Sequence, residues 1–252
     1  MEWMCRRVEV KVVDKPLRQL SENQFLNELP HADFALLEPY LRIVSLDRGM
    51  PLYEDGDAIS AVHFPLKGMI SLVTVTSEGD SIEAGTIGVD GIVGGMTAFG
   101  LHIAPTKAIV QIPAVLAEIP AGRFRAAAAK SEAIRDLCVR YNEVQLIQAR
   151  VTVACNALHS IEQRFCKWLL QSREVTDDGA VSLTQEFMAQ MLGVQRSSVS
   201  QVATKMQRLG YISYVRGQIR ILNRPGLEET ACDCVDSIVH KIHAIWPQIA
   251  RR

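Results

Sequence analysis

The spacing of apolar residues changes type several times along this chain. After a charged leader, residues 1–20, apolar residues recur at helical spacing over residues 23–41, which predicts short helices. Residues 42–119 instead hold short β-branched runs separated by turn residues, Pro65 and Gly68 among them. Many short strands with Gly-containing turns between them predict an antiparallel roll or barrel, with a break at each turn residue.

A long helix-forming segment follows the predicted roll. No Gly or Pro occurs from Arg123 to Arg173, and Ala, Leu, Gln, Arg and Glu dominate, which predicts a long helix. Ser160 and Gln163 have the spacing of a capping box, in which each side chain bonds to the backbone amide of the other residue. We therefore expect the long helix to stop near His159 and a new helix to begin at Ser160.

The first of these two helices carries a stripe with the spacing of a coiled-coil seam. Its members follow alternating four- and three-residue steps: Leu137, Tyr141, Val144, Gln148, Val151, Cys155 and Leu158. We interpret the stripe as a dimer interface, and the alternative is a helix that lies on its own roll. Gln148, the polar member, could set the register, face an effector or lie at a solvated helix edge.

Composition and charge narrow the class of protein. The chain has 252 residues, 48% of them hydrophobic, and a net charge of −1, so we expect a globular protein of two domains. No stretch approaches the ~18 consecutive apolar residues of a membrane-spanning helix, and the N-terminus has no apolar signal core, which predicts a cytoplasmic location. Residues 21–120 hold 13 acidic and 4 basic residues, whereas residues 183–224 hold 6 basic residues and 1 acidic residue. The local charge of +5 in the second segment is typical of a phosphate-binding surface.

The basic segment also has the pattern of a winged helix-turn-helix. A helix-period stretch ends at Gly193, which tolerates the positive φ of a tight turn, and a second helix opens at Arg196. Residues 211–222 then form two strand-like runs around an Arg-Gly-Gln turn, which is the expected wing. Helix, turn, second helix, wing and local charge together predict a DNA-binding domain.

The outward positions of the second helix carry side chains that can read DNA. Arg can make paired hydrogen bonds to guanine and Gln to adenine in the major groove, while cations farther along the helix meet phosphates. The residues predicted to read bases are Gln195, Arg196, Ser197, Ser200 and Gln201. Those predicted to contact phosphates are Thr184, Ser198, Lys205, Arg208, Arg216 and Arg220.

Taken together, these segments resemble the Crp/Fnr family of transcription regulators. The segment LTQEFMAQMLGVQRSSVSQV, which begins at Leu183, is similar to the family's DNA-binding signature, and the roll with Gly68 is similar to its cyclic-nucleotide-binding fold. The resemblance implies a homodimer on a palindromic operator, with RNA polymerase as a further partner of an activator. It also implies an α+β fold with three parts: an antiparallel β-roll effector domain over residues 21–122, a dimerisation helix over residues 123–159, and a winged helix-turn-helix domain with a C-terminal tail helix over residues 160–252.

The pocket for a cyclic nucleotide differs from that of the best-known family members. Cyclic-AMP-binding members neutralise the cyclic phosphate with a Gly-Glu and an Arg-Ser pair, where this chain has Gly91-Ile92 and Ala104-Pro105. Cyclic AMP is therefore not expected as the effector, although another anionic ligand could use Lys107 and nearby backbone amides. The residues assigned to this pocket are Gly85, Gly88, Gly91, Lys107 and Gln148.

The cysteines bear on metal binding in two places. Oxygen-sensing family members hold an iron–sulfur cluster with several N-terminal cysteines, whereas the leader here has only Cys5, so no such cluster is expected. The other candidate for metal or redox sensing lies near the C-terminus and comprises Cys232, Cys234, His240 and His243. The alternative there is an amphipathic tail helix with incidental thiols.

Other classes of protein have less support. The chain has no nucleophile elbow, phosphate-binding loop or dinucleotide-binding glycine motif, which argues against an enzyme. A third possibility is a ligand-sensing regulatory module that acts through a protein partner. That module would show no salt-sensitive affinity for DNA.

Overall fold

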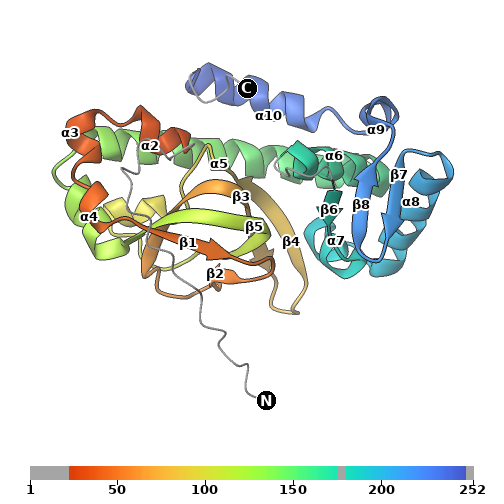
Figure 1. The fold of residues 1–252 in the computed structure, drawn as a ribbon, viewed down its shortest axis with the longest axis horizontal. Helices are drawn as coiled ribbons and strands as arrows, with labels where there is room; N and C mark the ends of the chain where they lie inside the picture. Colours follow the sequence, from red (N-terminus) through yellow and green to blue (C-terminus); the bar gives the residue numbers. More distant parts are fainter. Residues whose placement is uncertain (1–22, 175–179, 248–252) are drawn as a thin grey trace, which may run out of the picture. The chain divides into compact units, whose positions relative to one another are not determined.

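The computed structural model describes residues 23–174 and 180–247, which divide into two compact units (Figure 1). Unit 1 is formed within Met1–Ile70 and Ile87–Asn142, and unit 2 within Ser71–Thr86 and Glu143–Arg252. The long helix α5, Glu132–Leu158, contributes its first part to unit 1 and the rest to unit 2.

An antiparallel sheet follows the predicted strand-rich region. Its strands are β1 (Arg42–Leu46), β2 (Pro51–Tyr53), β3 (Ala61–Val75), β4 (Ser81–Ile87) and β5 (Lys107–Pro120). Their order is β1-β5-β3-β4, and β2 also pairs with β5. The β1–β5 register runs from Arg42 opposite Glu118 to Leu46 opposite Ala114. The predicted antiparallel roll is therefore confirmed.

The prediction of strand breaks at Pro65 and Gly68 is wrong, because β3 runs unbroken through both residues. At Gly68 the backbone has φ 84°, and a Cβ there would clash with the Pro113 carbonyl of β5. Glycine thus permits a close approach of two strands instead of ending one of them. The Pro65 carbonyl accepts a hydrogen bond from the side chain of Asn23 at 3.0 Å, so it is used in packing rather than in a turn.

Short helices close the core of unit 1 around three aromatic rings. These helices are α2 (Gln24–Glu28), α3 (His31–Phe34), α4 (Ala121–Ala128) and the 3-10 turns η1 (Glu38–Tyr40) and η2 (Gly95–Phe99). Phe64 of β3 lies 5.7 Å from Phe25 of α2 and 6.0 Å from Phe124 of α4, measured between ring centroids, and all three rings are fully buried. These contacts fix both helices to the sheet.

The helical segment after the roll contains one more break than predicted. The expected single helix from Arg123 is two helices, because α4 ends at Ala128 and Ser131 caps α5 by accepting the Ile134 amide at 3.0 Å. The capping box is confirmed. The Ser160 amide donates to Gln163 Oε1 at 2.9 Å, and α6, Ile161–Glu174, begins there.

The rest of unit 2 has the predicted helix-turn-helix, wing and tail helix. Its elements are β6 (Ala180–Ser182), α7 (Gln185–Leu192), α8 (Arg196–Arg208), β7 (Ile212–Val215), β8 (Gln218–Ile221), α9 (Arg224–Thr230) and α10 (Cys234–Ile245). The wing strands β7 and β8 pair antiparallel, and β6 extends this small sheet on the other side of β8 (Figure 1).

We expect Phe64→Ala to lower the free energy of unfolding by about 3–5 kcal/mol, because it deletes a fully buried ring that contacts two others. Phe99→Ala, which removes a ring that is 44% exposed in the same unit, should cost less than about 1 kcal/mol. Urea denaturation followed by circular dichroism measures both. Equal losses would show that the three rings are not the centre of this core.

Candidate DNA-binding surface

Helices α7 and α8 are joined by a turn whose backbone favours glycine. Thr184 caps α7, and its Oγ1 accepts the Phe187 amide at 3.2 Å. Gly193 ends α7 at φ 60°, and the Val194 amide donates back to the Ala189 carbonyl at 3.0 Å. The apolar sides of the two helices are buried, and their members are Met188, Met191, Leu192, Val199, Ala203 and Met206.

The opposite face of α8 is exposed. The exposed side chains of α8 are Arg196, Ser197, Gln201, Thr204, Lys205, Gln207 and Arg208, and Gln195 is the exposed N-cap residue. Ser198 and Ser200 are half-buried, and Ser200 Oγ donates to Gln185 Oε1 of α7 at 2.7 Å. Arg196, Ser197 and Gln201 therefore share one exposed helix, whereas Ser200 links α8 to α7.

Two of the residues predicted to contact phosphates already have partners within the chain. Lys205 Nζ lies 2.6 and 2.8 Å from the two carboxylate oxygens of Glu162 on α6. The hydroxyl of Thr184 is engaged as the cap of α7. Arg208, in the last turn of α8, is exposed.

The wing presents two further cations. Arg216 lies in the turn between β7 and β8 with φ 50°, and Arg220 lies on β8; both side chains are exposed. The Leu183 amide donates to the Gly217 carbonyl at 2.7 Å. This bond holds the wing close to the start of α7.

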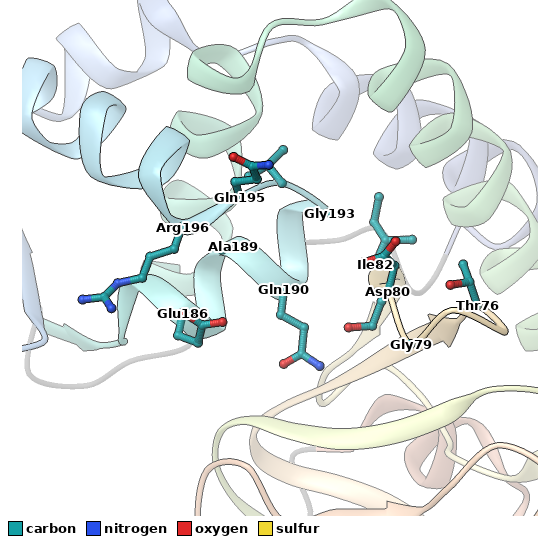
Figure 2. A pocket seen from close by; sticks show the side chains of 12 residues that line it. Thr76, Gly79, Asp80, Ile82, Glu186, Ala189, Gln190, Gly193, Gln195 and Arg196 are labelled. Atoms are coloured by element: carbon teal, nitrogen blue, oxygen red, sulfur yellow. The ribbon is translucent and has the colours of Figure 1, made fainter.

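A groove of about 840 Å³ lies in unit 2 beside the start of α8. Figure 2 shows it between the β3–β4 hairpin, with Asp80 and Ile82, and α7, with Glu186 and Gln190. The carboxylates of Asp80 and Glu186 line this groove and disfavour an anionic ligand. The side chain of Arg196 extends away from the hairpin (Figure 2).

Helix α5 has two apolar stripes, and the predicted seam lies on the inner one. Its members Leu137, Tyr141, Val144 and Cys155 are buried within the chain, Val151 is half-buried and Leu158 is exposed. These four side chains are packed inside the chain, so they do not form the predicted seam with a partner helix.

A second stripe repeats every seven residues on α5. Val139, Leu146 and Val153 are 54%, 39% and 71% exposed. Sequence reasoning missed this stripe because the inner stripe, with two residues per heptad, fits a coiled-coil pattern better than the outer stripe, which has one.

The residues assigned to an effector pocket lie in both units. In unit 2, Gln148 lies against Gly85, and Gln148 Oε1 accepts the Thr86 amide at 3.0 Å. The polar member of the predicted seam is thus neither at a solvated edge nor in a helix–helix interface.

In unit 1, the remaining pocket residues also have internal partners. The Gly88 amide donates to Asp90 Oδ1 at 3.1 Å, and Lys107 Nζ pairs with Glu54 Oε1 at 3.0 Å. Gly91 lies so close to the ring of Tyr141 that a Cβ would clash with it. Burial, and then the Asp90 carboxylate, hold the pKa of Tyr141 well above its ordinary value.

The two C-terminal cysteines do not lie with the histidines that follow them in sequence. Cys232 and Cys234 lie beside Cys155 and His159. His240 and His243 are exposed on α10, where a rise of about 1.5 Å per residue puts His240 roughly 9 Å beyond Cys234. The signal that could have found the observed set is the four-residue spacing of Cys155 and His159 on a helix.

Glu83 on β4 is a carboxyl group with a strongly altered pKa. Its Oε2 accepts a hydrogen bond from Ser71 Oγ at 2.7 Å. Burial raises the pKa of Glu83 from 4.5 to about 7, against the opposing effects of Ser71, the Lys167 charge and Trp168. Near neutral pH this group is therefore only partly ionised.

Comparison with known proteins assigns both halves of the chain. Residues 43–131 match the cyclic nucleotide-binding domain, and residues 163–230 match the Crp-like helix-turn-helix domain. The nitrogen fixation regulation protein FixK of Bradyrhizobium diazoefficiens is 25% identical over 216 residues, which cover 81% of this chain and 88% of FixK.

Two solved structures share the fold. FixK2 from Bradyrhizobium japonicum has a TM-score of 0.62 at 15% identity, over 76% of this chain and 98% of that chain. A transcriptional regulator of the Crp/Fnr family from Eubacterium rectale has a TM-score of 0.64 at 17% identity, over 83% of this chain and 98% of that chain.

A nucleotide-binding-type roll followed by a Crp-like helix-turn-helix defines a DNA-binding regulator with a sensor-type domain. The chain belongs to the Crp/Fnr family of transcription regulators, which confirms the resemblance seen in the sequence, and it is a regulator rather than an enzyme. Within residues 23–174 and 180–247, no helix combines the length and the apolar character needed to span a membrane.

We expect Glu83→Gln to stabilise the protein at pH 8 by on the order of 2 kcal/mol and to leave it nearly unchanged at pH 4.5. The folded state binds the Glu83 proton more tightly than the unfolded state does. Stability contributed by this group is therefore lost as the pH rises from about 4.5 to about 7. Thermal unfolding over this pH range measures the effect.

The matched control is Glu78→Gln, which removes a carboxylate from the exposed turn of the same hairpin. It should leave the pH dependence as in the wild type. The same gain at pH 8 from both variants would mean that general charge, and not burial of Glu83, is responsible.

Proposed function

We propose that this regulator binds a palindromic DNA operator as a homodimer in the cytoplasm, without control by cyclic AMP. The main support for the proposal is the exposed face of α8, which includes Arg196, Ser197 and Gln201. The opposite face of this helix is buried. At promoters that the protein activates, RNA polymerase would be a further partner.

The exposed face of α8 supports base reading in the major groove. Arg196 can bond bidentately to guanine and Gln201 to adenine, because both side chains are long and exposed. Ser197 is short enough to let the helix approach the base edges closely. Gln195, at the N-cap, is the remaining candidate for a base contact, whereas Ser200 acts by holding α8 to α7.

Phosphate contacts would orient the duplex without selecting sequence. Arg208 at the end of α8 and Arg216 and Arg220 on the wing supply exposed cations. Lys205 would exchange its Glu162 partner for a phosphate, so its net contribution should be smaller than that of a cation that has no carboxylate beside it. Thr184 and Ser198, near the N-termini of α7 and α8, complete the proposed set.

Dimerisation is supported by the outer stripe of α5. Val139, Leu146 and Val153 would form a short seam between two copies of the helix, since a heptad repeat places its residues along one side. A two-fold dimer presents two copies of α8, which matches the symmetry of a palindromic site.

Independence from cyclic AMP is supported by the internal partners of the pocket residues. The Gly88 amide is engaged by the Asp90 carboxylate, and the Lys107 charge is balanced by Glu54. A cyclic phosphate placed there would meet the negative charge of Asp90. An effector that uses this region would first have to displace these contacts.

The DNA site can be tested with duplexes enriched by the protein from a random pool. We expect Arg196→Ala to cost about 1–3 kcal/mol and to relax specificity at one base pair of each half-site. Arg208→Ala should weaken all sequences alike and lower the salt dependence of binding by about one phosphate contact. Fluorescence anisotropy at two salt concentrations, with and without cyclic AMP, separates the two effects.

A uniform loss from both variants on every sequence would contradict the assigned roles. Binding that requires cyclic AMP would overturn that part of the proposal. No salt-sensitive DNA binding by the wild type would favour the competing function, a sensing module that acts on a protein partner.

We expect Leu146→Glu to weaken self-association by about 100-fold or more, because two-fold symmetry removes two apolar contacts and introduces two facing carboxylates. Arg140→Glu, an exposed change on another side of α5, should leave the dimer intact. Sedimentation equilibrium measures both. A wild-type protein that is monomeric at all concentrations would exclude this seam.

A further inference from the structure

Four side chains of the types that bind transition metals meet in unit 2, away from the exposed face of α8. Cys155 lies in the last turn of α5, and His159 follows four residues later, with its amide bonded to the Cys155 carbonyl at 3.1 Å. Cys232 lies in the link between α9 and α10, and Cys234 is the first residue of α10. The three sulfur atoms and the imidazole nitrogen all lie within 4.8 Å of one another.

The distances fit one ion rather than a multinuclear cluster. Cys155 Sγ and Cys232 Sγ are 3.6 Å apart, and Cys234 Sγ and His159 Nδ1 are 3.4 Å apart. Zinc bonds of about 2.3 Å to sulfur and about 2.0–2.1 Å to nitrogen, arranged as a tetrahedron, require edges of about 3.8 Å and about 3.5 Å. Sulfurs that bind different irons of an iron–sulfur cluster lie farther apart than sulfurs that share one ion.

The surroundings suit a closed structural site. Cys155, Cys232 and Cys234 are buried, and Val151 packs against them. Three thiolates and a divalent cation leave one negative charge, and Lys167 Nζ lies 3.4 Å from Cys155 Sγ, where it can balance that charge. The imidazole nitrogen Nδ1 faces the sulfur of Cys234, as a ligand must.

The ligand types select the metal. Three soft sulfurs and one imidazole favour zinc and disfavour magnesium, calcium and manganese, which take oxygen ligands. Four protein ligands around one ion are typical of structural zinc sites, whereas catalytic sites keep one position for water.

We propose that Cys155, His159, Cys232 and Cys234 bind one zinc ion. The ion fastens the link before α10 to the end of α5, joining residues that are 77 positions apart in sequence. The metal would then hold the start of tail helix α10, while Ile242 and the C-cap residue Trp246 are buried at its other end. Its own histidines, His240 and His243, are not ligands.

The first test is the metal content of the full chain, purified untagged under reducing conditions and measured by inductively coupled plasma mass spectrometry. We expect about one zinc per chain, and less than about 0.1 in Cys234→Ser and His159→Asn. The controls are Cys166→Ser, a buried thiol of α6 outside the cluster, and His243→Ala on α10; both should retain the metal.

A second measurement does not depend on variants that fold. Zinc is removed from the wild type with a chelator, and cobalt(II) is added as a probe. We expect the visible absorption of tetrahedral cobalt with sulfur charge-transfer bands, saturation at one equivalent, and a melting temperature that rises with added zinc or cobalt.

Three results would overturn the proposal. One is fully reduced wild type that contains no zinc and gives no tetrahedral cobalt spectrum. Another is a Cys155–Cys232 disulfide, found by mass spectrometry, that forms in the cell and leaves the ion no complete ligand set. The last is metal retained by both cluster variants, or lost from His243→Ala, which would assign the ion to other residues.

Discussion

The whole structure depends on one 27-residue helix, α5, that has to serve two apolar surfaces at once. Leu137, Tyr141 and Val144 are buried inside the chain, while Val139 and Leu146 stay exposed. At 3.6 residues per turn, residues two apart point in nearly opposite directions, so a single helix can carry both stripes. The inner stripe packs into the chain's own cores, and the outer stripe is the surface that we propose for dimerisation.

Helix α8 shows how polar side chains divide between holding an element in place and exposing a binding face. Ser200 is hydrogen bonded to α7 and Lys205 to α6, and both contacts fix α8 against its neighbours. Arg196 and Gln201 are exposed on the same helix. Residues of similar polarity thus have different roles, because only some of them have a partner within reach.

Contacts within the chain also occupy the groups that were expected to bind an effector. The Gly88 amide donates to Asp90 and the Lys107 charge is balanced by Glu54, so two groups expected to bind an anion in the roll already have partners within the chain. The cysteines, by contrast, form a group of metal-binding side chains. Three thiols and an imidazole converge in a buried place, where such groups are costly to keep without a shared partner. The cysteine cluster therefore offers a metal ion a more complete set of ligands than the roll offers an anion.

The sequence by itself determined the features that depend on short-range interactions: the capping box at Ser160, the left-handed turn at Gly193, the wing and the strand-rich roll. Each of these features is specified by residues that are close together in sequence. The exposed face of α8 was also predictable, since its apolar residues recur with the helical period and therefore fall on the opposite side of the helix. Only the tertiary structure decided that β3 continues through Gly68, because that depends on how closely β5 approaches. It also decided that the stripe of α5 with the better coiled-coil spacing is buried inside the chain, because the spacing does not say which surface the helix packs against. It decided as well which residues join Cys232, since contacts between distant segments leave no local pattern in sequence.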